Sequence, residues 1–167
     1  MGRTPERIAR AGRKDMSDVA TIAAGHFKAG YNCSQSVLMA LCHRYGLSEE
    51  LAARLATGFG VGMGRAGTCG AVSGAVMALG LFGGGGGPAG AAAKAATYAR
   101  SREFCRRFGE RHGSLVCLDL IGLDPSSPEG LRQARSEGRF QSICVELVKS
   151  AARTADEVMA SGVAESA

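Results

Sequence analysis

The chain has 167 residues and a formal net charge of +5, with 46% hydrophobic and 21% charged residues. This length and balance fit one domain with an ordinary core and exclude wholesale disorder. Aromatic residues make up only 5% and Trp is absent, so surfaces that stack sugars or single-stranded nucleic acid are disfavoured and no nucleic-acid partner is expected.

Helical periodicity runs along nearly the whole chain, and no convincing alternation of apolar and polar residues indicates a strand. Glycine-rich segments at 58–67 and 83–87 separate the predicted helices. With the residue that starts each, these helices are 17–29 (Ser17), 32–45 (Asn32), 48–57 (Ser48), 68–82 (Thr68), 88–108 (Pro88), 114–122 (Ser114), a short helix ending near 136, and 142–159 (Ser142). The pattern predicts an all-α, single-domain bundle of six to eight helices over residues 16–162.

The segment from Cys69 to Phe82 carries no charge. Its 14 residues fall short of the roughly 20 that a membrane-spanning helix needs, so a buried helix is predicted and no membrane partner is expected. Gly70, Gly74 and Ala78 recur at four-residue spacing, which would let another helix approach this face closely.

Residues 1–14 carry +4 of the net charge, and residues 1–15 are predicted to be a basic, flexible tail. No continuous apolar segment of the kind found in signal peptides follows them, so a cytoplasmic location is expected. Structural disulfides are rare in that compartment. The six cysteines therefore indicate metal binding, redox chemistry or simple packing.

Four cysteines fall in the first turn of four different predicted helices. They are Cys33, Cys69, Cys117 and Cys144. The first turn of a helix stabilises a thiolate, whose pKa can fall from about 8.5 toward roughly 3.5–7.5. Four converging helix starts would build an electropositive pocket lined by sulfur. Cys42 and Cys105 sit late in their helices and are interpreted as packing residues, as any single buried cysteine often is.

Four segments of the chain together resemble a known family. They are Tyr31-Asn32-Cys33-Ser34-Gln35-Ser36-Val37, Gly67-Thr68-Cys69-Gly70-Ala71-Val72-Ser73-Gly74-Ala75, Phe108-Gly109 leading to Cys117, and Cys144. This order is similar to that of the C-GCAxxG-C-C family of redox-active proteins, over residues 18 to 150. The resemblance implies redox activity and carries the family's four cysteines onto Cys33, Cys69, Cys117 and Cys144. A similar module in split-Soret cytochromes implies an iron–sulfur cluster.

Two functions are compatible with four such cysteines. The first is electron transfer to a redox partner protein through an iron–sulfur cluster bound by all four thiolates. The alternative is metal-free thiol–disulfide chemistry, in which the same four residues are the redox thiols and no cofactor is needed. The protein would then be an electron carrier or an oxidoreductase.

Other interpretations are less favoured. A structural zinc site usually takes its ligands from C-x₂₋₄-C pairs, and this sequence has none. A helical packing module without activity is a further alternative. The segment 62–67 matches G-x-G-x-x-G, but a helix precedes it and no acid follows at the required spacing, so close backbone approach near Cys69 is predicted instead. The arginine-rich stretch 100–111 is interpreted as a solvated helix face, with docking of an acidic partner as the functional alternative.

Overall fold

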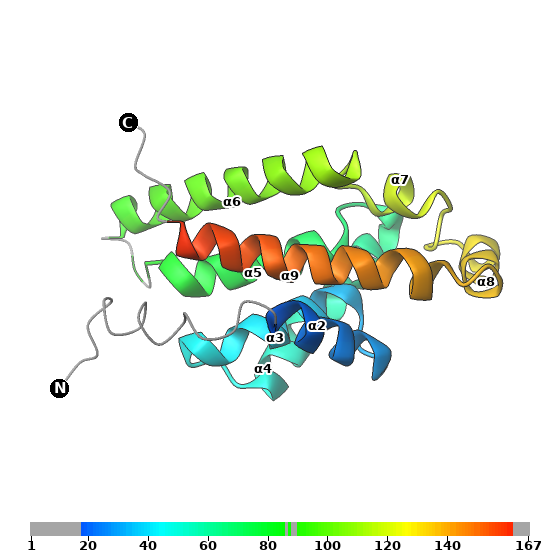
Figure 1. Ribbon diagram of the computed structural model, residues 1–167, viewed down its shortest axis with the longest axis horizontal. Coiled ribbons are helices and arrows are strands. Elements are labelled where there is room, and N and C mark those ends of the chain that lie inside the picture. Colours follow the sequence, from blue (N-terminus) through cyan, green and yellow to red (C-terminus); the bar gives the residue numbers. More distant parts are fainter. Residues whose placement is uncertain (1–17, 86, 88–89, 162–167) are drawn as a thin grey trace.

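The computed structural model describes residues 18–85, 87 and 90–161 (Figure 1). Within this part of the chain there are eight α-helices and no strand, which confirms the predicted all-α bundle. The helices are α2 (Asp18–Lys28), α3 (Cys33–Cys42), α4 (Glu49–Ala56), α5 (Gly70–Gly83), α6 (Ala91–His112), α7 (Cys117–Ile121), α8 (Pro128–Ser136) and α9 (Val145–Ala160). Two 3₁₀ turns, η1 (His43–Tyr45) and η2 (Thr57–Phe59), and two π-helical turns, η3 (Gly62–Ala66) and η4 (Phe140–Cys144), join them.

The predicted tail at 1–15 and the predicted starts at Ser17 and Pro88 lie outside the described residues. The domain boundaries at 16 and 162 therefore stay predictions. None of the described helices combines the length and the apolar character that crossing a bilayer requires.

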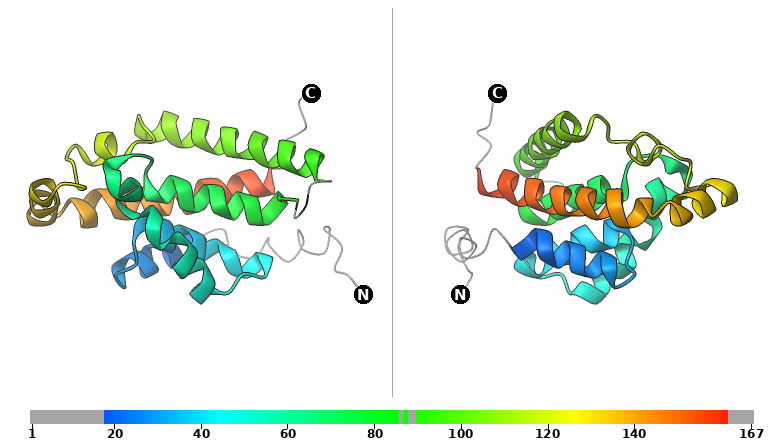
Figure 2. Two further views of the ribbon diagram at one scale, coloured as in Figure 1. Left: turned by 180° about the vertical axis from the view of Figure 1, so that it is seen from behind. Right: turned by 45° about the vertical axis from the view of Figure 1, so that its right-hand side comes forward.

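Helices α5 and α9 lie side by side at the centre, and α6 covers them on one side while α2, α3 and α4 cover the other (Figures 1 and 2). The main core gathers side chains from α3, α5, α6 and α9. Its largest fully buried members include Phe104, Phe108, Leu38, Leu41 and Leu79. In Figure 1 the chain enters α3, α5 and α9 from the same end, where α7 also lies.

The start of α3 is fixed by a reciprocal cap, as predicted for Asn32. The Asn32 side-chain oxygen accepts from the Gln35 amide at 3.0 Å, and the Asn32 amide donates to the Gln35 side chain at 2.9 Å. The Gln35 side-chain amide also donates to the Ala53 carbonyl at 3.0 Å and to the Thr57 hydroxyl at 2.9 Å. These bonds tie the residues beside Cys33 to the end of α4.

Glycines on α5 let α3 approach at backbone distance, which confirms the role predicted for this face. A Cβ on Gly74 would stand 2.6 Å from the Ser34 carbonyl oxygen. A Cβ on Gly70 would meet the Phe59 carbonyl oxygen at 3.0 Å and the Cys33 Cβ at 3.2 Å. The starts of α3 and α5 are therefore adjacent only because both positions lack a side chain.

Two predicted caps are wrong because the chain is extended where a helix start was expected. Thr68 forms an isolated antiparallel bridge with Val116, and the cap position of α5 falls on Cys69. Val116 is likewise the cap residue of α7. The Ser114 hydroxyl instead accepts from the Val116 amide at 3.0 Å and donates to Asp119 at 2.7 Å.

The cap predicted at Ser142 is also wrong. Ser142 lies inside η4, and its hydroxyl donates to the Gly138 carbonyl at 3.0 Å, one turn earlier. Arg139 already has helical backbone angles, so the helical path continues through Cys144 into α9. A serine inside a helix can bond back to the preceding turn, and this local competition makes the sequence signal ambiguous.

The glycines of α5 provide a matched test of the contact between α3 and α5. Gly74→Ala forces a methyl group against backbone and should lower the free energy of unfolding by about 1–3 kcal/mol. A Cβ on Gly80, in the same helix, would meet no neighbouring atom within 4 Å. Gly80→Ala should raise stability by about 0.5–1 kcal/mol because alanine favours the helix. Urea unfolding of both variants tests this, and equal effects would contradict the close approach.

Candidate functional site

The four predicted cysteines come together at the end of the bundle where α3, α5 and α7 begin. Cys117 and Cys144 are buried with Ile121 in a small apolar cluster apart from the main core. Cys33 packs against this cluster and also against the main core, of which Cys69 is a member. Each of the four thiols affects the ionisation of at least one other. Their role in function stays a prediction, but the structure places them as neighbours.

The isolated bridge explains how Cys69 and Cys117 meet. The Cys69 amide donates to the Leu115 carbonyl at 2.8 Å, and the Cys117 amide donates to the Gly67 carbonyl at 2.6 Å. Side chains alternate across extended backbone. Thr68 and Val116 are exposed, so the cysteine that follows each of them is turned inward.

A second contact positions Cys144 against α7. The Arg139 guanidinium donates to the Ile121 carbonyl at 2.7 Å and pairs with Glu137 at 2.7 Å. This bond ties the helical turn that contains Cys144 to the C-terminal end of α7. Sequence reasoning did not single out Arg139, because a bond to a distant carbonyl has no signature in the local pattern.

The expectation of four cysteines in the first turns of helices is only partly right. Cys33 and Cys117 are the first residues of α3 and α7. Cys69 stands one position earlier, as the cap residue of α5. Cys144 is not at a helix start, because helical backbone precedes it. The positive end of a helix is therefore not a feature shared by all four sulfurs.

Burial, not the helix end, dominates the thiol chemistry. Burial raises the pKa of Cys69 to about 11, although the amides of Ala71 and Val72 act in the opposite direction. Burial, then the neighbouring charges of Cys69, Cys144 and Asp124, raise the pKa of Cys117 to about 12. The predicted lowering of the pKa is wrong for these thiols, because desolvation of the thiolate outweighs the helix terminus.

Cys33 and Cys144 interact most strongly. A hydrogen bond with Cys144, followed by burial, raises the pKa of Cys33 well above its ordinary value. The same bond lowers the pKa of Cys144 even though burial opposes it. Cys33 is therefore the donor and Cys144 the acceptor, and Cys144 is the sulfur of this pair that carries negative charge more readily.

The spacing of the sulfurs limits which groups they could hold. Within the described ranges, no three His, Cys, Asp or Glu side chains are grouped as ligands of one metal ion. A single tetrahedral zinc needs four sulfurs at about 2.3 Å from one point. The four thiols are neighbours without meeting that condition.

The glycine-rich segment beside the site is tightly folded, as predicted for 62–67. A Cβ on Gly62 would stand 2.5 Å from the Gly67 nitrogen. Val61, Met63 and Ala66 have φ of 54°, 61° and 53°, a left-handed backbone that costs about 1–2 kcal/mol per non-glycine residue. The 3₁₀ turn η2, not a strand, precedes this segment, so it lacks the setting of a dinucleotide-binding loop.

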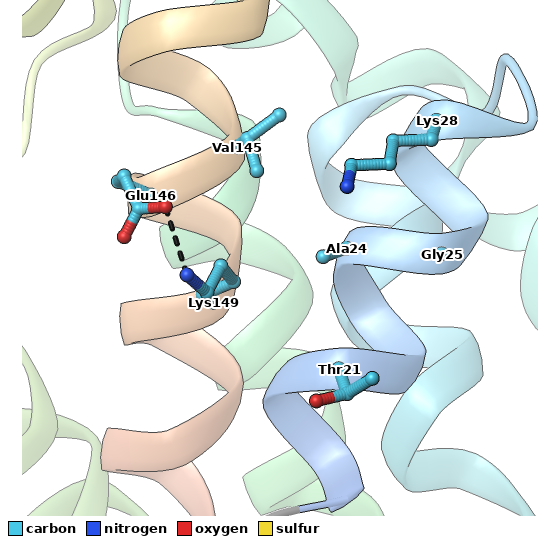
Figure 3. A pocket seen from close by; sticks show the side chains of 7 residues that line it. All are labelled: Thr21, Ala24, Gly25, Lys28, Val145, Glu146 and Lys149. Atoms are coloured by element: carbon cyan, nitrogen blue, oxygen red, sulfur yellow. Dashed lines mark hydrogen bonds and ion pairs between the residues drawn. The ribbon is translucent and has the colours of Figure 1, made fainter.

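The two cysteines interpreted as packing residues lie elsewhere. Cys42 is buried in the main core, and its thiol donates to the Met39 carbonyl at 3.3 Å. Cys105 packs against that core from α6. An open groove between α2 and α9, lined by Lys28, Glu146 and Lys149 among others, contains none of the four site cysteines (Figure 3).

Comparison with known proteins identifies the cysteine pattern. A family model described as "Putative redox-active protein (C_GCAxxG_C_C)" matches residues 31–158, which is 128 of the 167 residues. The matched span contains all four site cysteines. No curated protein and no solved structure matches the chain significantly.

The raised thiol pKa values predict a pH dependence of stability. In the reduced, metal-free protein, folded Cys69 and Cys117 keep protons that the unfolded chain releases near pH 9. Their stabilisation is complete below that pH and is lost as pH rises through about 11 and 12. The loss approaches about 1.4 kcal/mol per pH unit for each thiol.

Urea unfolding below and above pH 9, with reductant present, measures this loss. Cys69→Ala and Cys117→Ala should each fall less steeply than the parent protein, while other titrating groups cancel in the comparison. Identical slopes in all three proteins would show that these thiols are not shielded from ionisation.

Proposed function

The chain belongs to the C_GCAxxG_C_C family of redox-active proteins, and on this basis we propose that it transfers electrons through an iron–sulfur cluster held by Cys33, Cys69, Cys117 and Cys144. The observation that carries the proposal is the convergence of four buried or half-buried thiols from four separate segments. Four cysteine thiolates are the usual ligand set of such clusters. When bound, the cluster supplies a centre that gains and loses single electrons.

The sulfur donors favour this occupant over zinc. A cluster of several iron and sulfide atoms holds its ligands farther apart than one ion does, which agrees with four neighbouring thiols that do not surround a single point. Soft thiolate ligands suit iron–sulfur clusters. All six cysteines are free thiols, which fits a reducing compartment such as the cytoplasm.

The surrounding residues provide the conditions that a buried redox centre needs. Apolar neighbours such as Ile121 and Phe140 exclude water from the sulfurs, and the Ala71 and Val72 amides act on the Cys69 sulfur. Burial and hydrogen bonds to sulfur both set the reduction potential of such a site. Because burial keeps Cys69 and Cys117 protonated, these residues must release protons when they become ligands.

An apolar rim supports docking of a redox partner protein beside the site. Of the eight exposed large apolar side chains in the described ranges, four are Tyr31, Met63, Val116 and Leu118. Tyr31 is two residues before Cys33, and Val116 and Leu118 flank Cys117. Met63 is in η3, which contacts α7. By contrast, Arg106 and Arg107 pair with Glu103 and Glu110 of their own helix, as a solvated face would.

Anaerobic purification or reconstitution tests the cluster directly. We expect a coloured protein whose iron and sulfide contents rise together, and loss of both in Cys33→Ser or Cys117→Ser because each removes one ligand. Cys42→Ser and Cys105→Ser are the matched controls and should keep the cluster. A colourless parent protein that takes up neither iron nor sulfide would contradict the proposal.

The hydrogen bond between Cys33 and Cys144 favours a second candidate, thiol–disulfide chemistry in the metal-free protein. These two thiols are already in contact, so oxidation can join them with little movement of the chain. Equilibration in mixtures of reduced and oxidised glutathione, followed by acid quenching and peptide mass spectrometry, should yield a reversible Cys33–Cys144 disulfide. Four thiols that stay reduced, or a bond to Cys105, would rule this candidate out.

A further inference from the structure

The four site sulfurs differ in access from solvent. Cys69, Cys117 and Cys144 are 3%, 5% and 2% exposed, whereas Cys33 is only half-buried. Cys33 begins α3 directly after the half-buried cap residue Asn32 and the exposed Tyr31. An external reagent therefore reaches Cys33 before it reaches the other three.

We propose that Cys33 is the sulfur that exchanges with an external low-molecular-weight disulfide, and that Cys144 first accepts the Cys33 proton and then resolves the mixed disulfide. This inference rests on the second candidate function, thiol–disulfide chemistry of the same site. A small disulfide is the substrate class because the Cys33 side chain is recessed, and a slim, extended S–S group can enter where a folded protein surface meets the neighbouring residues first.

The chemistry follows from the direction of the hydrogen bond. Cys33 donates to Cys144, so Cys144 can take up the proton as the Cys33 sulfur attacks. That attack forms one S–S bond to Cys33, breaks the external S–S bond and releases one thiolate. Cys144 then gives its proton to the released thiolate and attacks the Cys33 sulfur, which expels the second thiolate. Two electrons pass from the cysteine pair to the external disulfide, which leaves as two thiols.

The surroundings of Cys144 suit a resolving residue and not an entering one. Cys144 is enclosed with Cys117 and Ile121, and Arg139 anchors its helical turn to α7. An attacking group cannot reach it without first displacing these side chains. Its contact with Cys33, however, gives it direct access to a mixed disulfide formed there.

The test uses oxidised glutathione with the reduced, metal-free full-length protein. Cys144→Ser should accumulate one glutathione on Cys33, located by peptide mass spectrometry, because the resolving thiol is gone. Cys33→Ser should take up glutathione on Cys144 at least about tenfold more slowly, since reactivity requires access. The parent protein should pass through to the Cys33–Cys144 disulfide. Cys42→Ser is the matched control and should behave as the parent does.

A brief pulse of N-ethylmaleimide on the native parent protein gives a readout that needs no variant. We expect Cys33 to be labelled before Cys144. Equal labelling, or glutathione uptake at Cys144 as fast as at Cys33, would overturn the assigned roles while the internal disulfide still forms. A parent protein that forms no Cys33–Cys144 disulfide would overturn this inference together with the second candidate function, whereas iron and sulfide uptake tests the cluster separately.

Discussion

The site depends on the backbone contact between the starts of α3 and α5. Ser34 is fully buried against Gly74, and Cys33 lies against Gly70, at distances that leave no space for a side chain on either glycine. This contact brings Cys33 close to the segment that carries Cys69. The Asn32–Gln35 cap then fixes the first turn of α3, so that Cys33 cannot move away by fraying of the helix.

The remaining cysteines are added by single interactions and not by a large packed surface. One bridge pair, Thr68 with Val116, orients Cys69 and Cys117 to the same inner side. One bond from Arg139 to the Ile121 carbonyl holds the turn of Cys144 against α7. The main core of α3, α5, α6 and α9 supplies the rigid frame to which these short connections attach.

This arrangement makes the site a place where proton and electron chemistry are coupled. Burial holds Cys69 and Cys117 in their neutral forms, while Cys33 and Cys144 share a hydrogen bond that favours charge on Cys144. Any ligand of the thiolates must displace protons, and any disulfide between Cys33 and Cys144 must remove the shared one. Both candidate functions therefore begin from the same protonation state of the four sulfurs.

Local sequence was enough to specify the helical class, the caps at Asn32 and Ser48, and the close-packing face of Gly70 and Gly74, because each depends on residues within one or two turns. It also singled out the four cysteines, although through helix starts that hold for only part of the set. The bridge of Thr68 with Val116 became visible only in the folded chain, since a single pair leaves no periodic pattern. The direction of the pKa shifts likewise came from the fold, because desolvation depends on which distant segments cover a thiol, and no local spacing encodes that burial.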